Sequence, residues 1–465
     1  MRSPSVKSSF VWQGPGGLRE VLILAFPLIL STASWTVQQF IDRMFLAWYS
    51  AETIAAAMPA GMLNFACVSL FMGMASYVDT FVAQYYGAGR LERIGPAIWQ
   101  GVYVGLLGGL ALALLVPLAG PIFALVGHAE AVQRHEVVYF SILNLGAAPP
   151  IVAAALSGFY AGRGKPWPVL WVNLGGTLVN IVLDWLLIFG RWGLPALGMA
   201  GAAIATVISG VFNVAVYAWL IFRPRYDSSC QTLKGWRLER ELFSRLVRYG
   251  LPAGVQFFFD MAAFTLFVLF VGRLGINELA ATNIAFNISN FSFMPMVGQG
   301  IAVSVLVGQY LGRNQPELAA RSCWSAFWLA AGYMGLVALV FVLVPQVFIA
   351  PFISEALSGR FAPIQKQAEM LLRFVALYSI FDAMNIMFAS ALKGAGDTRF
   401  VMLTILIMGL FTMVLPVYVA VQLKASLYVC WSFVTLNIAG QGLAFLWRFK
   451  RGAWRQLRVI EMPVD

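Results

Sequence analysis

Five aspartates stand inside long apolar stretches of this chain, where an uncompensated charge is costly. They are Asp42, Asp79, Asp184, Asp260 and Asp382. An acid in such surroundings must be neutralised or paired. Basic partners are scarce, because Arg43 is the one Lys or Arg that falls well inside an apolar stretch. We therefore expect the acids to meet a proton, a metal cation such as Na⁺ or a cationic substrate, and the residues alone leave these three open.

Four of the acids have polar neighbours at helical spacing, which places these side chains on one face of a helix. The neighbours are Ser34 and Gln38 for Asp42; Asn173, Thr177 and Asn180 for Asp184; Gln256 for Asp260; and Tyr378 and Asn385 for Asp382. A further stripe of Asn283, Asn287 and Asn290 has the same spacing. Hydrogen bonding between helices is the structural alternative for such stripes. The fifth acid, Asp79, is expected to cap a helix or pair with Arg90 or Arg93.

Soft and aromatic side chains accompany the acids of the second half. Aromatic faces attract organic cations, and Met adapts to irregular shapes. We therefore expect a substrate cavity that combines these side chains with the polar stripes. Its expected lining is Gln38, Gln256, Tyr378, Asn283, Asn287, Met294 and Phe259. Ordinary packing is the alternative role for any one of the apolar members.

The composition indicates a membrane protein, since 60% of the 465 residues are hydrophobic and 11% are charged, against about 25% charged in soluble domains. Apolar runs long enough to cross a bilayer recur along the whole chain. The twelve expected spans are 20–48, 54–86, 97–126, 137–161, 167–190, 199–222, 246–272, 279–311, 322–349, 370–392, 400–422 and 426–447. The four Cys have no paired spacing and the two His share one loop, so we expect no structural metal site.

The basic residues indicate the orientation of these spans. With the N-terminus inside, 23 of the 31 Lys and Arg residues lie on the inner side and seven on the outer side. This bias predicts two cytoplasmic termini, in a multi-pass protein of the cell's inner (plasma) membrane. It also explains the net charge of +11 by anionic lipid headgroups rather than nucleic acid.

An internal repeat divides the spans into two sets of six. At an offset of 225 residues, the sequence pairs Gln84-Tyr85-x-Gly87 with Gln309-Tyr310-x-Gly312, Pro27 with Pro252, and Gly73 with Gly298; at 232, residues 161–165 pair with 393–397. An even number of spans gives both halves the same orientation. Parallel repeats of this kind are typical of transporters that handle their substrate between the halves.

The repeat predicts an all-α membrane protein with two pseudo-symmetric six-helix lobes. The expected parts are a cytoplasmic tail at 1–19, a first lobe at 20–222, a basic cytoplasmic loop at 223–245, a second lobe at 246–447 and a cytoplasmic tail at 448–465. We expect the protein to function as a monomer. Pro27 and Pro252 interrupt the first and seventh spans ahead of Asp42 and Asp260, so both helices are expected to bend there.

Several longer motifs resemble the multidrug and toxic compound extrusion (MATE) family. They are "FPLILSTASWTVQQFIDRMFLAW" at 26–48, "VAQYYGAG" at 82–89, "GRGKPWPVLWVNLGGTLVNIVLDWLLIFG" at 162–190, "GMAGAAIATVIS" at 198–209, "GQYLGR" at 308–313 and "LKGAGDTR" at 392–399. The resemblance covers nearly the whole chain. It implies two lobes around a central cavity, and export of cationic, often aromatic, compounds by H⁺ or Na⁺ antiport through alternating access, with no other cofactor.

The resemblance also implies roles for particular residues. Asp42, Asn180, Asp184 and Thr206 match the family's cation site in the first lobe. Asp260 and Asp382 match the second-lobe carboxylates of the NorM-like bacterial branch, in which many members carry Glu at the first position.

Two alternatives differ in class from a drug exporter. A flippase for lipid-linked or other metabolite substrates within the same superfamily would need basic residues in its cavity for a pyrophosphate, and this chain has acids there. A membrane-embedded enzyme would need a nucleophile, base or metal set that the sequence does not show.

Asp42 and Arg43 are adjacent, so they should point in directions about 100° apart. Asp42 is expected to face the lobe interior and Arg43 to reach the outer interface.

Overall fold

The chain folds into α-helices and a few short helical turns. The computed structural model describes residues 12–126, 128–352 and 361–461, and no β-strand occurs in these ranges. The helices of the first half are α1 (Leu18–Tyr49), α2 (Ala51–Ser76), α3 (Val78–Gly87), η1 (Leu91–Arg93), α4 (Ile94–Ala113), η2 (Val116–Leu118), α5 (Ala119–Val126), α6 (Glu130–Leu145), α7 (Ala148–Ala161), α8 (Trp167–Phe189) and α9 (Met199–Ile221).

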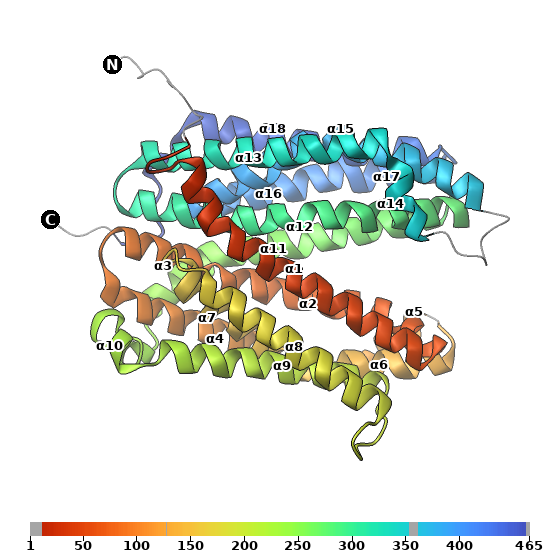
Figure 1. The fold of residues 1–465 in the computed structure, drawn as a ribbon, viewed down its shortest axis with the longest axis horizontal. Helices are drawn as coiled ribbons and strands as arrows, with labels where there is room; N and C mark the ends of the chain where they lie inside the picture. Colours follow the sequence, from red (N-terminus) through yellow and green to blue (C-terminus); the bar gives the residue numbers. More distant parts are fainter. Residues whose placement is uncertain (1–11, 127, 353–360, 462–465) are drawn as a thin grey trace. The chain divides into compact units, whose positions relative to one another are not determined.

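A connecting segment and the second half follow. Their helices are α10 (Pro224–Cys230), η3 (Lys234–Trp236), α11 (Arg240–Gly272), α12 (Ile276–Gly312), α13 (Pro316–Leu343), α14 (Pro345–Ile349), η4 (Ala350–Phe352), α15 (Phe361–Ala395), α16 (Thr398–Met408), the π-helical turn η6 (Gly409–Val414), α17 (Leu415–Gln422), α18 (Leu427–Arg451) and η7 (Ala453–Gln456). Figure 1 shows them along the chain.

The structure supports eleven membrane spans, or twelve if one bent helix pair is counted as a single span. Within the described ranges, eleven helices are long and apolar enough to cross a membrane, and the pair α6 and α7 makes the twelfth. This pair bends by 42° at its junction. The bend falls at Gly146, just before Pro149 and Pro150 open α7. A proline cannot continue the hydrogen bonding of a preceding helix, so the sequence itself ends α6 there.

The helices form two compact units. Unit 1 comprises Met1–Ile29, Phe259–Leu311 and Gln315–Arg458, and unit 2 comprises Leu30–Phe258, Gly312–Asn314 and Val459–Asp465. The sequence repeat assigns all of α1 to the first lobe and all of α11 to the second. The compact units instead divide both helices, so α1 begins in unit 1 and ends in unit 2, and α11 does the reverse.

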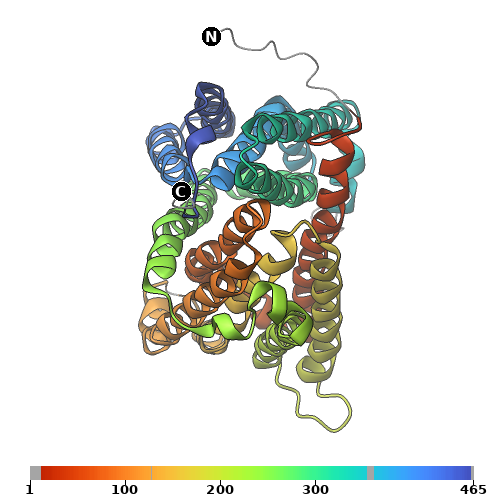
Figure 2. The ribbon, with the colours of Figure 1, turned by 90° about the vertical axis from the view of Figure 1, so that its left-hand side faces the viewer.

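Each unit is a bundle of packed helices. In unit 2, α8 packs on α9, α4 on α7 and α2 on α6; in unit 1, α15 packs on α13 and α18. Figure 2 looks nearly along the helices and shows these bundles in cross-section. The buried core of unit 1 includes the aromatic side chains Phe267, Phe341 and Trp431. That of unit 2 includes Phe45, Phe123 and Phe140.

The connecting segment between the halves is an ordered part of unit 2. The indole N–H of Trp99 on α4 donates to the carbonyl of Thr232 at 2.7 Å, and the Gln100 side chain donates to the carbonyl of Arg237 at 3.2 Å. Asp227 accepts the backbone N–H groups of Leu233 and Lys234. These contacts fix the segment on α4.

Paired glycines give the two halves equivalent helix contacts. A Cβ on Gly73 of α2 would lie 2.7 Å from the Cα of Gly254 on α11, and a Cβ on Gly298 of α12 would lie 2.6 Å from the backbone nitrogen of Ile29 on α1. Gly73 and Gly298 are repeat mates, and so are Ile29 and Gly254. The internal repeat therefore appears as the same close backbone approach in each unit.

Gly73→Ala should lower the thermal unfolding midpoint of the purified protein. The added Cβ would collide with the backbone of α11, and overpacking of this kind costs about 1–3 kcal/mol. The matched control is Gly335→Ala on α13, where an added Cβ meets nothing within 4 Å. Equal midpoints for the two variants would show that the close approach at Gly73 is unimportant.

Candidate functional site

Two buried acids and an amide meet between α1 and α8. When the Asn180 amide is oriented to donate, its nitrogen lies 2.9 Å from Asp42 Oδ1 and 3.3 Å from Asp184 Oδ2. The side chains of Asp42 and Asp184 are also within hydrogen-bonding reach of each other. Asp42 is 4% exposed, and Asp184 and Asn180 are fully buried. The structure thus brings together three of the four residues expected in the first-lobe site.

The fourth expected member, Thr206, bonds within its own helix. Its hydroxyl donates to the carbonyl of Ala202 on α9 at 3.0 Å. This is the usual local bond of a threonine inside a helix. Thr206 is half-buried, and its membership of the site remains a prediction.

Asp42 and Arg43 occupy different environments. Asp42 is buried, whereas Arg43 is exposed. Their different exposure agrees with the expected difference in direction, and the placement of Arg43 at the outer interface remains a prediction.

A ladder of polar contacts joins α1 to α8 along the predicted stripe. Asn173 Nδ2 donates to Ser31 Oγ at 2.6 Å, and Thr177 Oγ1 lies 3.5 Å from Gln38 Oε1. The hydroxyl of Tyr217 on α9 approaches Asn173 Oδ1 at 3.5 Å. These contacts hold the second part of α1 against α8, so that the acids meet at a fixed register.

One oxygen of the acid pair lacks a hydrogen-bond partner within the ranges that the structure describes. Asp184 Oδ1 is buried and has no hydrogen-bond partner among the described residues. Two carboxylates this close, buried away from water, need a proton or cation to offset their repulsion. Their oxygens suit a hard cation or a proton equally well. No cluster of three His, Cys, Asp or Glu side chains that could hold a metal occurs in the described part of the chain.

The second pair of acids lies in unit 1. Asp382 on α15 is buried, and Asp260 on α11 is half-buried. Tyr378, one turn before Asp382, is also buried.

A polar network beside Asp382 was not expected from the sequence. Asn385 Nδ2 donates to Gln441 Oε1 at 3.1 Å, and Gln441 Nε2 donates to Asn437 Oδ1 at 3.1 Å. The hydroxyl of Thr412 donates to the same Asn437 oxygen at 3.0 Å. Thr412 lies in the π-helical turn η6, a feature that often marks functional positions. Asn437 and Gln441 are one turn apart on α18, which is the signal that could have identified them.

The two units fill equivalent positions differently. Thr412 is the repeat mate of Asn180, and Phe267 is the mate of Asp42. Phe267 is fully buried and packs against Trp431 with ring centroids 6.1 Å apart. Unit 1 therefore has a buried phenylalanine where unit 2 has Asp42, and a threonine where unit 2 has Asn180.

The expected cavity residues are shared between the units. Gln38 and Gln256 belong to unit 2, and Phe259, Asn283, Asn287, Met294 and Tyr378 belong to unit 1. Asn287 is exposed, and its amide donates to the carbonyl of Asn283 at 2.8 Å. Their role as a cavity lining remains a prediction.

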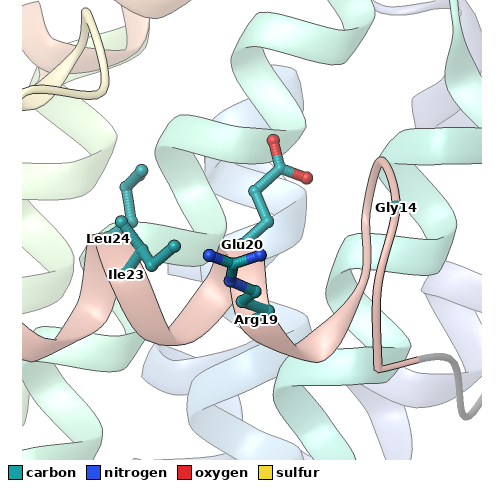
Figure 3. A pocket seen from close by; sticks show the side chains of 5 residues that line it. All are labelled: Gly14, Arg19, Glu20, Ile23 and Leu24. Atoms are coloured by element: carbon teal, nitrogen blue, oxygen red, sulfur yellow. The ribbon is translucent and has the colours of Figure 1, made fainter.

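Two surface hollows are lined by residues other than the membrane aspartates. One of about 210 Å³ is lined by Gly14, Arg19, Glu20, Ile23 and Leu24 at the start of α1 (Figure 3). The other, of about 300 Å³, lies between α8 and α9 and is lined by Pro168, Trp171, Val172, Phe212, Val216 and Leu220. Neither contains one of the membrane aspartates.

Comparison with known proteins supports the helical architecture with two repeated halves. The MatE family model matches residues 27–186 and again 252–418. The two matches begin at the repeat mates Pro27 and Pro252. A probable multidrug resistance protein NorM of Brucella suis biovar 1 (strain 1330) is 28% identical over 408 residues, which cover 86% of this chain and 85% of that protein.

Two solved structures share the fold at low sequence identity. A multidrug resistance MATE family transporter of the MOP superfamily in an outward-facing conformation has a TM-score of 0.85 and 19% identity, and covers 98% of this chain and 100% of its own. A MOP superfamily transporter from Pyrococcus furiosus Vc1 (DSM3638) has a TM-score of 0.85, 20% identity and the same coverage. Its binding pocket is described as having reverse polarity, which suggests a different function for that protein.

Asn180→Ala should destabilise the protein. The substitution removes the donor that two buried carboxyl groups share, and an unsatisfied buried polar group costs about 1–3 kcal/mol. The thermal unfolding midpoint should fall clearly below that of Asn290→Ala, a matched change at an exposed position of α12. An unchanged midpoint in Asn180→Ala would contradict the bridging role.

Proposed function

This chain belongs to the MatE family, and we propose that it exports small organic cations from the cell in exchange for H⁺ or Na⁺ by alternating access. Members of the family are membrane transporters rather than enzymes, and the eleven or twelve spans fit that class. The coupling ion, the substrate and the conformational cycle are parts of the proposal.

The buried acid pair of unit 2 carries the proposal. Asp42 and Asp184 share the amide of Asn180, and Asp184 Oδ1 has no partner among the described residues. Such a pair is stable when one proton or one cation offsets its charge. An antiporter needs a group of this kind, because the same acids must bind the ion on one side of the membrane and release it on the other.

The relatives and the residues both support the proposed substrate class. The Brucella suis relative carries the name of a probable multidrug resistance protein. In this chain, acids and aromatic side chains occur together, as with Asp260 beside Phe259. Negative charge and aromatic faces both favour organic cations. The flippase alternative fits less well, because a pyrophosphate headgroup would meet these acids rather than basic residues.

The membrane location, the orientation and the oligomeric state are also part of the proposal. The chain is a multi-pass membrane protein. The basic residues favour an inner (plasma) membrane location with both termini in the cytoplasm. We propose that the monomer is the transporting unit.

Substrate efflux from proteoliposomes under separate pH and Na⁺ gradients tests the coupling. One of the two gradients should drive efflux of a cationic dye, and Asp42→Asn should abolish the gradient-driven part. The reason is that the amide cannot take up a proton or balance a bound cation. Asp184→Asn should behave in the same way, because the two acids form one site.

The matched control for this experiment is Arg43→Ala. It removes the adjacent charge, which is exposed, and should leave gradient-driven efflux unchanged. Antiport is wrong if neither gradient drives efflux in the unmodified protein. The site assignment is wrong if Asp42→Asn transports normally.

Pro27 is the proposed hinge of α1. It lies inside the helix, two residues before the point where α1 passes from unit 1 to unit 2. Pro252 lies six residues before the corresponding point in α11. A proline removes one hydrogen bond of the helix and makes bending there easier.

Pro27→Ala should slow transport without preventing folding. Restoring the missing N–H strengthens α1 as a straight helix, so a conformational step that bends it becomes slower. The maximum efflux rate should fall, while the thermal unfolding midpoint should not. Wild-type efflux rates in this variant would rule out Pro27 as a hinge.

A further inference from the structure

The Gln-Tyr-x-Gly motif of the second half holds a glutamate from the start of the chain. The hydroxyl of Tyr310, at the end of α12, lies 2.7 and 2.9 Å from the carboxylate oxygens of Glu20. Glu20 also accepts the backbone N–H of Gly16 at 2.6 Å. Figure 3 shows Glu20 in the first turn of α1, beside the loop of Gly14. In unit 1, the repeated tyrosine thus fixes the start of a helix through an acid.

The same motif in the first half binds an acid from the other end of the chain. Tyr85 is the repeat mate of Tyr310, but the mate of Glu20 is Arg245, a base. The hydroxyl of Tyr85 instead donates to Glu461 Oε2 at 2.8 Å. Arg245 Nη1 donates to the same oxygen at 3.1 Å. The C-terminal segment therefore supplies the acid, because α11 has an arginine at the position equivalent to Glu20.

Glu461 lies in a site built from three arginines and a tyrosine of unit 2. Its Oε1 is 2.9 Å from Arg90 Nη2 and 3.2 Å from Arg93 Nε. With Arg245, the three arginine side chains and Glu461 are 25–29% exposed. Charge-assisted contacts that converge on both oxygens of one carboxylate are strong and specific.

The backbone of the C-terminal segment is held as well. Arg90 Nη1 donates to the Glu461 carbonyl at 2.9 Å, and the backbone N–H of Val459 donates to Gln84 Oε1 at 2.9 Å. Val459 and Ile460 are buried. Gln84 and Tyr85 are the first two residues of the repeated motif, so the motif itself forms part of the site.

Glu461 is the acid that all three arginines share. Arg90, Arg93 and Arg245 also pair singly with Glu92, Glu239 and Glu241, whose side chains are 51%, 37% and 79% exposed. Partial burial acts to raise the pKa of Glu461, but hydrogen bonds and the charges of Arg93 and Arg90 outweigh it and hold this pKa below its usual range. The segment is therefore bound as a carboxylate at neutral pH.

A short tether joins this site to the other unit. Trp454 is fully buried in unit 1, where it stacks on Phe449 with ring centroids 4.7 Å apart. The chain passes from unit 1 to unit 2 between Arg458 and Val459. Five extended residues span at most about 18 Å, so the chain keeps Val459 within that distance of Trp454.

We propose that Arg90, Arg93, Arg245 and Tyr85 form a receptor for the chain's own C-terminal segment, with the Glu461 carboxylate as its ligand. Docking restrains a conformational step of the transport cycle, and undocking accompanies that step. The restraint rests on the proposed transport function, whereas the receptor does not.

Thiol labelling tests the receptor directly. Ile460→Cys reports docking, because this side chain is 7% exposed; the four native cysteines, which are free, are replaced by Ser or Ala. In the purified protein, adding Glu461→Gln should speed labelling by a water-soluble maleimide at least about tenfold, since a charge-assisted contact is lost. Arg90→Gln should act in the same direction. The two changes together should be less than additive, because they remove one shared contact.

Efflux measurements test the restraint. Glu461→Gln should raise the maximum efflux rate at least about twofold, with an unchanged half-saturating substrate concentration, because it releases a conformational restraint and leaves substrate binding intact. The matched control is Glu317→Gln. It removes an ion pair to Arg455 in the same terminal segment, where the side chains are 71% and 42% exposed, and it should change neither readout.

The outcomes test the receptor and the conformational restraint separately. Labelling of Ile460→Cys that is unchanged by Glu461→Gln overturns the receptor. Faster labelling with an unchanged or lower efflux rate overturns the restraint and leaves a purely structural anchor. If the unmodified protein transports nothing, the proposed function fails, and the labelling result still decides the receptor.

Discussion

Burial of carboxyl groups among apolar helices is the constraint on which the rest of unit 2 depends. Asp42 and Asp184 are too close and too buried to carry two uncompensated charges. The Asn180 amide satisfies one oxygen of each acid, and the Ser31–Asn173 contact keeps α1 in register with α8. One oxygen of Asp184 has no hydrogen-bond partner among the described residues. The acid pair therefore depends on a compensating positive charge.

The repeat gives the two halves equivalent helix contacts but different buried side chains. Gly73 and Gly298 make the same close helix contacts in their units. The position of Asp42 is occupied in the other half by Phe267, which belongs to an aromatic core. The tyrosine of the repeated motif binds an acid in both halves, but Tyr85 obtains Glu461 from the end of the chain. Helix packing is preserved because it needs only small residues at a fixed spacing, while each half can hold different polar groups.

Helices α1 and α11 each pack partly in one unit and partly in the other. Each helix begins in one unit and ends in the other, with Pro27 or Pro252 shortly before the change. In α1, the second part carries Asp42 and the first part carries Glu20, which is fixed by Tyr310. The acid site and the Tyr310 contact are therefore attached to two parts of one helix.

The sequence by itself determined the spans, the repeat and the polar stripes, because each depends on local spacing or on self-similarity along the chain. It placed Asp42, Asn180 and Asp184 on two helix faces that the structure brings together. The tertiary structure alone decided that α1 and α11 are divided between units, that Asn385 joins a network on α18, and that Glu461 binds beside Tyr85. Tyr85 and Glu461 are 376 positions apart. Such a contact leaves no periodic signal, since only the packing of distant segments brings its charges together.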